Sequence, residues 1–135
     1  MAFQFDDGGR SRYFKGETGD CVTRSLAICT GRDYKVIYDE LFELTGKTPR
    51  EGVSVKGAKV KRYFRELGLV WKPTMKIGQG CKVHLRSDEL PSGRLICNCS
   101  RHLVAVIDGV IKDIYDPSRD GTRCVYGYWQ HTNLS

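Results

Sequence analysis

A cysteine, a histidine and an aspartate at three separate positions are residue types that together carry out nucleophilic chemistry. Cys21 follows the pair Gly19-Asp20 and begins a stretch with helical periodicity. The first turn of a helix has unpaired backbone N–H groups and the positive end of the helix dipole, so a thiol there is more readily ionised and more nucleophilic. A thiolate nucleophile also needs a base, and the base needs an orienting group. His102 and Asp113 offer both within one short downstream segment.

The spacing of His102 and Asp113 is informative because a tight turn is expected between them. Asp108 and Gly109 separate two runs rich in β-branched residues, which is a strong signal for a two-residue hairpin turn. Side chains alternate between the faces of a strand, so this turn places His102 and Asp113 on one face as diagonal neighbours. Asp116 falls on the opposite face unless a bulge intervenes. Asp113 is therefore the favoured orienting residue, and Asp116 is the alternative.

The elements that must position these residues begin with three helices. Helical spacing of apolar residues predicts helices over about 20–30, 34–44 and 54–67. Asp33 is a suitable N-cap for the second helix, and Gly68 is a suitable stop for the third. Cys21 is thus expected at the N-terminus of the first helix.

The second half of the chain has the character of strands. Strand-like runs occupy residues 69–71, 94–99, 102–107, 110–115 and 124–129. Residues 1–17 are expected to be a loosely structured lead-in with a short strand near Tyr13. Trp71 and Trp129 are expected to pack in the core rather than line a substrate groove, because aromatic side chains bury large areas. Helices followed by an antiparallel meander predict an α+β fold, with N-terminal helices packed on a C-terminal antiparallel sheet.

Size and composition favour one soluble domain over residues 1–135. The chain is 40% hydrophobic and 28% charged, and no apolar run approaches the ~20 residues that span a bilayer. The N-terminus lacks the basic region and apolar core of a secretion signal, so a cytoplasmic location and no membrane partner are expected. The six cysteines are irregularly spaced, and Cys29, Cys97 and Cys124 lie in apolar runs. Reduced thiols are the expectation in that compartment.

The charge balance is moderately basic, with a formal net charge of +6. A cluster of basic residues is expected to form the solvated face of the third helix and comprises Lys56, Lys59, Lys61, Arg62 and Arg65. Such a balance permits a nucleic-acid or acidic partner. It does not indicate nucleic acid, because no nucleic-acid fingerprint is present.

A zinc site is the main chemical alternative. Cys97, Cys99 and His102 are close in sequence, and Cys81 and His84 lie upstream. Cysteines separated by a single residue within a strand do not match the two-to-four-residue spacing of structural zinc sites. The sequence therefore favours a site without metal or other cofactor.

The sequence resembles the papain-like cysteine peptidase superfamily in two places. Gly19-Asp20-Cys21 running into Arg24-Ser25-Leu26-Ala27 is one, and His102-Leu103-Val104-Ala105-Val106 is the other. Compact bacterial and phage members, near the peptidases that process bacteriocin leaders, are the most similar. The resemblance implies a papain-like α+β fold and a cysteine hydrolase, a peptidase or isopeptidase, acting on a polypeptide or another amide-bearing substrate. It makes Cys21 the nucleophile, His102 the general base and then acid, and Asp113 the orienting residue.

One departure from that family concerns the oxyanion hole. Papain and the leader peptidases have a glutamine six residues before the nucleophile, where this chain has Lys15. The backbone N–H of Cys21 would then act with a donor near Thr18, Gly19 or Asp20. The side chain of Asp20 is expected to point away from the thiol, capping the helix or pairing with an arginine. There are two alternative functions. One is a non-catalytic papain-fold module that binds a protein or nucleic acid, and the other is a small zinc-binding domain.

Overall fold

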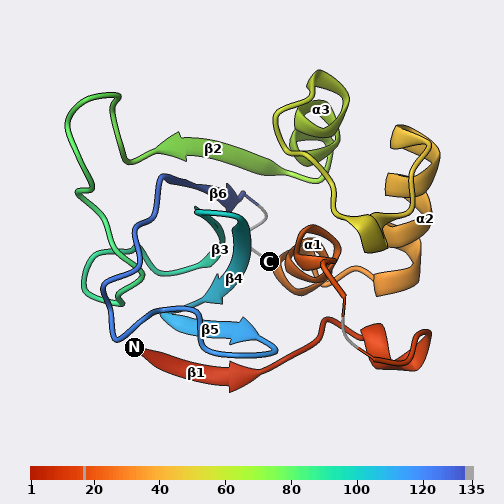
Figure 1. The fold of residues 1–135 in the computed structure, drawn as a ribbon, viewed down its shortest axis with the longest axis horizontal. Helices are drawn as coiled ribbons and strands as arrows, with labels where there is room; N and C mark the ends of the chain where they lie inside the picture. The colour runs from red at the N-terminus through yellow and green to blue at the C-terminus, as the bar shows by residue number, and fades with distance from the viewer. Residues whose placement is uncertain (17, 133–135) are drawn as a thin grey trace.

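A six-stranded sheet with α-helices packed on one face makes up the protein (Figure 1). The computed structural model describes residues 1–16 and 18–132. Within these residues the fold is α+β, as predicted. The strands are β1 (Ala2–Phe5), β2 (Leu69–Pro73), β3 (Arg94–Cys99), β4 (His102–Ile107), β5 (Val110–Asp113) and β6 (Gly127–His131). Their order across the sheet is β1-β5-β4-β3-β6-β2.

The sheet is mixed rather than antiparallel throughout, which corrects the sequence-based expectation. β1 runs parallel to β5, with Ala2 opposite Val110, whereas the other neighbouring pairs are antiparallel. Residues 2–5 are thus an edge strand of the sheet, and the expectation of a loosely structured lead-in is wrong for them. The strand expected near Tyr13 is wrong, because a short 3₁₀ helix (η1, Arg10–Arg12) precedes that residue and Tyr13 follows it with no strand partner.

The helices are α1 (Cys21–Thr30), α2 (Tyr34–Thr45) and α3 (Ala58–Glu66), with a 3₁₀ turn η2 (Pro49–Glu51) before α3. The first two match the prediction to within one residue at each end, and the Asp33 carboxylate accepts a hydrogen bond from the Lys35 N–H at 3.1 Å. The third begins at residue 58 instead of 54. The Ser54 hydroxyl instead accepts from the Lys56 N–H at 3.3 Å, a local turn that competes with helix.

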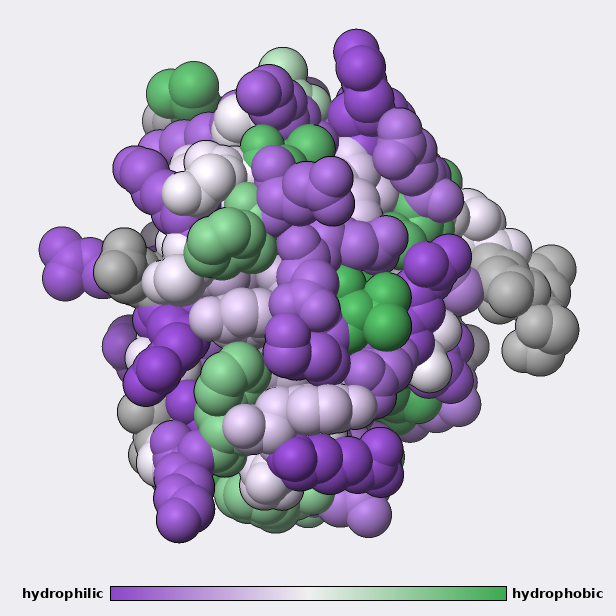
Figure 2. Space-filling view, turned by 90° about the vertical axis from the view of Figure 1, so that its right-hand side faces the viewer, coloured by the Kyte–Doolittle hydropathy of each residue, from purple (hydrophilic) through white to green (hydrophobic). Residues whose placement is uncertain are grey.

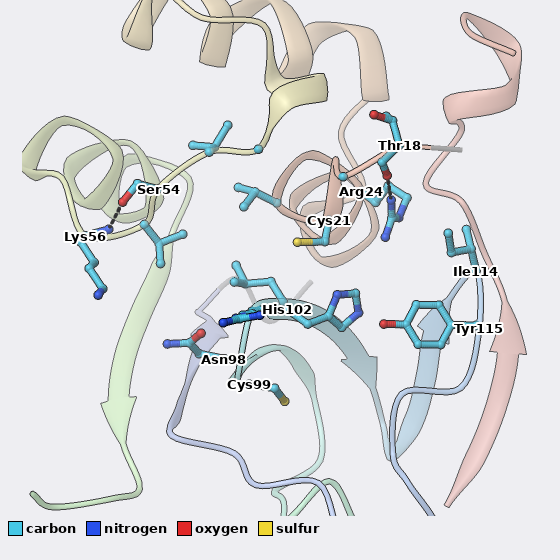
Figure 3. A pocket seen from close by; sticks show the side chains of 17 residues that line it. Thr18, Cys21, Arg24, Ser54, Lys56, Asn98, Cys99, His102, Ile114 and Tyr115 are labelled. Atoms are coloured by element: carbon cyan, nitrogen blue, oxygen red, sulfur yellow. Dashed lines mark hydrogen bonds between the residues drawn. The ribbon is translucent and has the colours of Figure 1, made fainter. Parts of the chain in front are cut away.

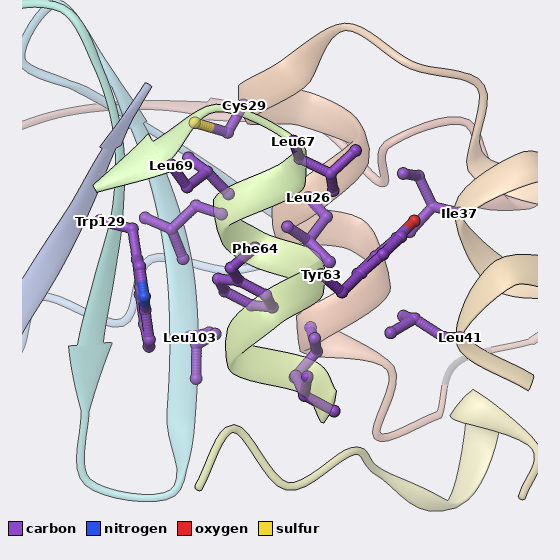
Figure 4. Packing of buried hydrophobic residues seen from close by; sticks show 13 residues of the cluster. Leu26, Cys29, Ile37, Leu41, Tyr63, Phe64, Leu67, Leu69, Leu103 and Trp129 are labelled. Carbon is purple, nitrogen blue, oxygen red and sulfur yellow. The ribbon is translucent and has the colours of Figure 1, made fainter. Parts of the chain in front are cut away.

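Hydrophobic side chains fill both faces of the sheet. On the helical face, Leu26 of α1 and Phe64 of α3 pack with Leu103 and Trp129 from the sheet (Figure 4). The Phe64 and Trp129 ring centroids are 4.9 Å apart. The opposite face is covered by the segments around residues 83–90 and 125. Trp129 is in the core as predicted, but the prediction for Trp71 is wrong, since 42% of its surface is exposed.

The hairpin between β4 and β5 has the predicted turn. Ile107 pairs with Val110, and both Asp108 and Gly109 have positive φ, at 48° and 80°. Two consecutive positive φ values are the signature of the type I′ turn, whose twist matches that of the flanking strands. The β5 strand ends at Asp113, two residues before the predicted end.

A disulfide joins Cys81 to Cys124, with their Cα atoms 5.9 Å apart. The expectation of reduced thiols is therefore wrong for these two residues and matches the structure for Cys21, Cys29, Cys97 and Cys99. The bond links segments 43 residues apart, next to an isolated bridge between His84 and Cys124. The strand predicted over residues 124–129 begins at residue 127 as β6, so Cys124 lies before this strand.

The outer surface of the helices is mainly hydrophilic, with small separate hydrophobic areas (Figure 2). The basic side chains of α3 are exposed, as the sequence pattern of this helix predicts. Among residues 1–16 and 18–132, no helix is both long enough and apolar enough to cross a membrane.

Candidate active site

Cys21 is the first residue of α1, and this helix is attached to the sheet near both of its ends. The Ser25 hydroxyl lies 2.6 Å from the carbonyl oxygen of Cys21 and 3.1 Å from that of Leu103 on β4. At the other end, Arg94 of β3 donates to two carbonyls of the last turn of α1 at 2.6 and 2.9 Å. These contacts fix the start of α1 over the beginning of β4.

His102 and Asp113 form a close buried pair at the ends of β4 and β5. His102 Nε2 lies 2.6 Å from Asp113 Oδ2. This contact agrees with the face alternation predicted from the hairpin. Asp116, the alternative orienting residue, instead accepts a hydrogen bond from the Ser118 N–H at 2.9 Å within its own turn. With Nε2 bonded to the carboxylate, Nδ1 is the ring nitrogen that remains for the Cys21 thiol.

Cys21 and His102 both line an open pocket of about 520 Å³. Cys21 faces the pocket from α1, and His102 enters from the sheet (Figure 3). The Tyr115 ring lies beside the imidazole, with centroids 5.4 Å apart. The loop before α3, including Val53 and Val55, lines the other side. The structure thus brings the predicted cysteine and histidine to one pocket, with the aspartate buried behind the histidine.

The thiol of Cys21 is more acidic than an ordinary cysteine. Burial alone would raise its pKa, but the hydrogen bond with His102 and a hydrogen bond with the Leu103 backbone outweigh this effect. The charges of His102 and Arg24 act in the same direction, and the net result is a lowered pKa. The buried thiols differ: burial raises the pKa of Cys29 to about 12 and that of Cys99 to about 11.

The imidazole of His102 is more basic than usual. Burial alone would lower its pKa, but the hydrogen bonds with Asp113 and Cys21 and the charges of both residues raise the pKa to about 9. A lowered thiol pKa beside a raised imidazole pKa favours a thiolate–imidazolium pair at neutral pH. This charge state is the one that a cysteine nucleophile requires.

A buried charge network supports the site from behind. The Asp20 carboxylate is 1% exposed and forms an ion pair with Arg10 at 3.1 Å. It also pairs with Arg24 and accepts a hydrogen bond from the Tyr34 hydroxyl. Arg24 extends further and lies 3.5 Å from Asp113 Oδ1. Asp20 therefore points away from the thiol and pairs with arginines, one of the two arrangements expected, and its side chain makes no helix-capping hydrogen bond.

The three oxyanion candidates differ in their positions. Thr18 and Gly19 line the pocket, but the Thr18 hydroxyl donates to the Arg50 carbonyl at 2.9 Å. The Asp20 carboxylate is held in the buried network. Sequence reasoning missed Asn98, whose side chain reaches the pocket from β3 (Figure 3). A single amide within the apolar run at 95–99 was the signal that could have indicated it.

The residues of the zinc alternative do not form one cluster, although Cys99 and His102 are cross-strand partners. Cys81 is bonded to Cys124, and the His84 imidazole lies 3.2 Å from the Glu89 carboxylate. Across residues 1–16 and 18–132, no group of three or more histidine, cysteine or acidic side chains has an arrangement that could hold a metal ion. Cys97 and Cys99 instead pack in the core on the face of the sheet away from the helices, and Cys99 also lines the pocket.

Comparison of the chain with protein-family models, with curated proteins and with solved structures finds no match.

Proposed function

We propose that the protein is a cysteine hydrolase with a papain-like arrangement that cleaves an amide bond. The observation that carries the proposal is the position of His102, which lies 2.6 Å from Asp113 and beside the Cys21 thiol in an open pocket. The nucleophile begins a helix, the base begins a strand, and the orienting carboxylate ends the neighbouring strand. This is the nucleophile–base–orienter arrangement of thiol hydrolases.

Each residue has a defined role in the proposed reaction. The Cys21 thiolate attacks the carbonyl carbon of the substrate, and a new C–S bond forms. The His102 imidazolium then donates its Nδ1 proton to the leaving amine as the C–N bond breaks. Neutral His102 next takes a proton from water, which attacks the thioester and releases the acid and the thiolate. Asp113 orients the ring through Nε2 and stabilises its protonated form.

The tetrahedral intermediates need hydrogen-bond donors for their oxyanion. We propose that the Cys21 backbone N–H and the Asn98 side-chain amide supply them, since both residues line the pocket. Replacing Asn98 with leucine, which is similar in size but lacks the N–H donors, should lower kcat by about 10²–10³-fold. KM should change little, because the interaction is made chiefly in the transition state. An unchanged kcat would exclude Asn98 from this role.

Selective alkylation of Cys21 tests the proposed nucleophile. Limiting iodoacetamide near neutral pH should modify Cys21 more than about tenfold faster than Cys29, Cys97 or Cys99, because its thiolate is stabilised and accessible. Peptide mapping by mass spectrometry measures each site. The untreated protein should also cleave members of a peptide library, and the Cys21→Ser variant should not. Slow, uniform alkylation without cleavage would instead support the non-catalytic binding module.

A further inference from the structure

Trp71 forms a fixed, half-exposed aromatic platform beside the active-site pocket. Its ring lies on Gly127 of β6: a Cβ at residue 127 would be only 2.3 Å from Trp71 Cη2. The other support is Trp129, whose ring centroid is 4.5 Å away. Gly127 does not have a positive φ, so the space taken by the indole is the structural reason for glycine. The sheet is thus shaped to hold this ring in place while 42% of its surface faces solvent.

The platform lies in a second hollow, of about 440 Å³, that adjoins the active-site pocket. The two hollows share three lining residues, Val55, Lys56 and Asn98. A chain bound across Cys21 would therefore meet the Trp71 platform when it extends past Asn98. The adjoining hollow has the position of a subsite for residues on one side of the bond that is cleaved.

Outside positions 17 and 51, the residues that line the two hollows include basic side chains but no aspartate or glutamate. Lys61 and Arg65 are one turn apart on α3 and lie beside the platform, while Lys56 lies where the hollows meet. These three side chains are exposed, and so is that of Arg101 at the pocket. The electrostatic complement of this surface is a ligand with negative charge.

We infer that this groove binds an acidic peptide segment that carries an aromatic or large apolar side chain. The apolar side chain packs on Trp71, and neighbouring carboxylates pair with Lys61, Arg65 and Lys56. As a statement about substrate selection, the inference rests on the proposed hydrolase. A peptide is favoured over a nucleic acid because the groove continues into a pocket whose reactive groups suit an amide bond.

Binding measured without cleavage tests the groove separately from the hydrolase. The Cys21→Ala variant is titrated into three fluorescein-labelled peptides, and anisotropy is followed. The first contains Glu-Glu-Phe between glycines, the second replaces both glutamates with glutamine, and the third replaces phenylalanine with alanine. The first should bind about fivefold more tightly than the second, the effect of two exposed ion pairs. It should bind about tenfold more tightly than the third, the effect of one well-packed aromatic anchor.

Matched charge variants assign the effect to the groove. In the Cys21→Ala background, Lys61→Gln with Arg65→Gln should abolish the preference for glutamate over glutamine. The control is Lys59→Gln with Arg62→Gln, which removes the same charge from the same helix but next to a different hollow. That control should keep the preference. Trp71→Ala should abolish the preference for phenylalanine over alanine.

The outcomes separate the two proposals. Charge-dependent binding to the groove supports this inference even if Cys21 proves unreactive, a result that would leave a peptide-binding module. Equal binding of the three peptides overturns the inference while leaving selective alkylation of Cys21 as support for the hydrolase. Tighter binding of a labelled oligothymidylate, lost in Lys61→Gln/Arg65→Gln, would overturn it in favour of a nucleic-acid surface.

Discussion

Replacing His102 with alanine is expected to lower kcat for amide hydrolysis about 10⁴-fold, the upper end of the range for losing a general acid–base. In the proposed reaction the imidazole both stabilises the Cys21 thiolate and protonates the leaving amine, so one substitution removes two functions. The measurement is kcat for the library peptide that the wild-type protein cleaves fastest. Asp113→Asn should cause a smaller loss, because the imidazole remains but is less well oriented and its protonated form is less stabilised.

The pH dependence should separate those two functions. In the wild-type protein, alkylation of Cys21 should begin below the ordinary pKa of a thiol and stay high at alkaline pH, since it needs only the thiolate. Hydrolysis should begin over the same range but fall above pH about 9, where His102 loses the proton that the leaving amine needs. In His102→Ala the onset of alkylation should move to higher pH, because burial still raises the pKa of Cys21 and its main opposing contact is gone.

His84→Ala is the matched control for this prediction. The His84 imidazole also contacts a carboxylate, that of Glu89 at 3.2 Å, but it lies outside the candidate active-site pocket. Its loss should leave both pH profiles unchanged. Were His102→Ala to retain wild-type hydrolysis, or were the onset of alkylation to stay where it is, His102 could not be the base for Cys21.

The parts of the site that could be predicted from sequence are those set by local rules. Residues 108–109 determine a tight turn, and the two-residue period of the strands then places His102 and Asp113 on one face. Helical periodicity and the following Gly31 likewise located α1, with Cys21 at its start. In each of these cases the geometry follows from residues within a few positions of one another.

The parts that could not be predicted depend on contacts between distant segments. Parallel pairing of β1 with β5 leaves no local pattern, because residues 2–5 need only an extended conformation. The Cys81–Cys124 bond joins positions 43 residues apart. Gly127 does not have a positive φ, so backbone conformation does not explain why glycine is needed there. The need comes from the Trp71 ring that lies on it. The platform and its basic neighbours come from β2, β6 and α3, and no single segment contains the groove.

Replacing Asp20 with asparagine is expected to lower the free energy of unfolding by about 3 kcal/mol, since removing one partner of a buried ion pair leaves an uncompensated charge. Asp20 is the carboxylate shared by Arg10 and Arg24, and both guanidinium groups are buried. Asparagine keeps the shape and can still accept a hydrogen bond from Tyr34, so the loss should reflect charge rather than packing. Urea unfolding followed by circular dichroism measures the change.

The Lys35–Asp39 pair provides the control, because it has the same i, i+4 spacing on a helix but lies on the surface. Asp39→Asn should change the free energy of unfolding by less than about 1 kcal/mol. Equal losses of unfolding free energy in the two variants would contradict the prediction that the buried Asp20 contributes more to stability than the surface Asp39. The predicted difference bears on the site, because Arg24 also lies 3.5 Å from Asp113. The network thereby connects Asp20, which precedes the proposed nucleophile, to Asp113, which is proposed to orient its base.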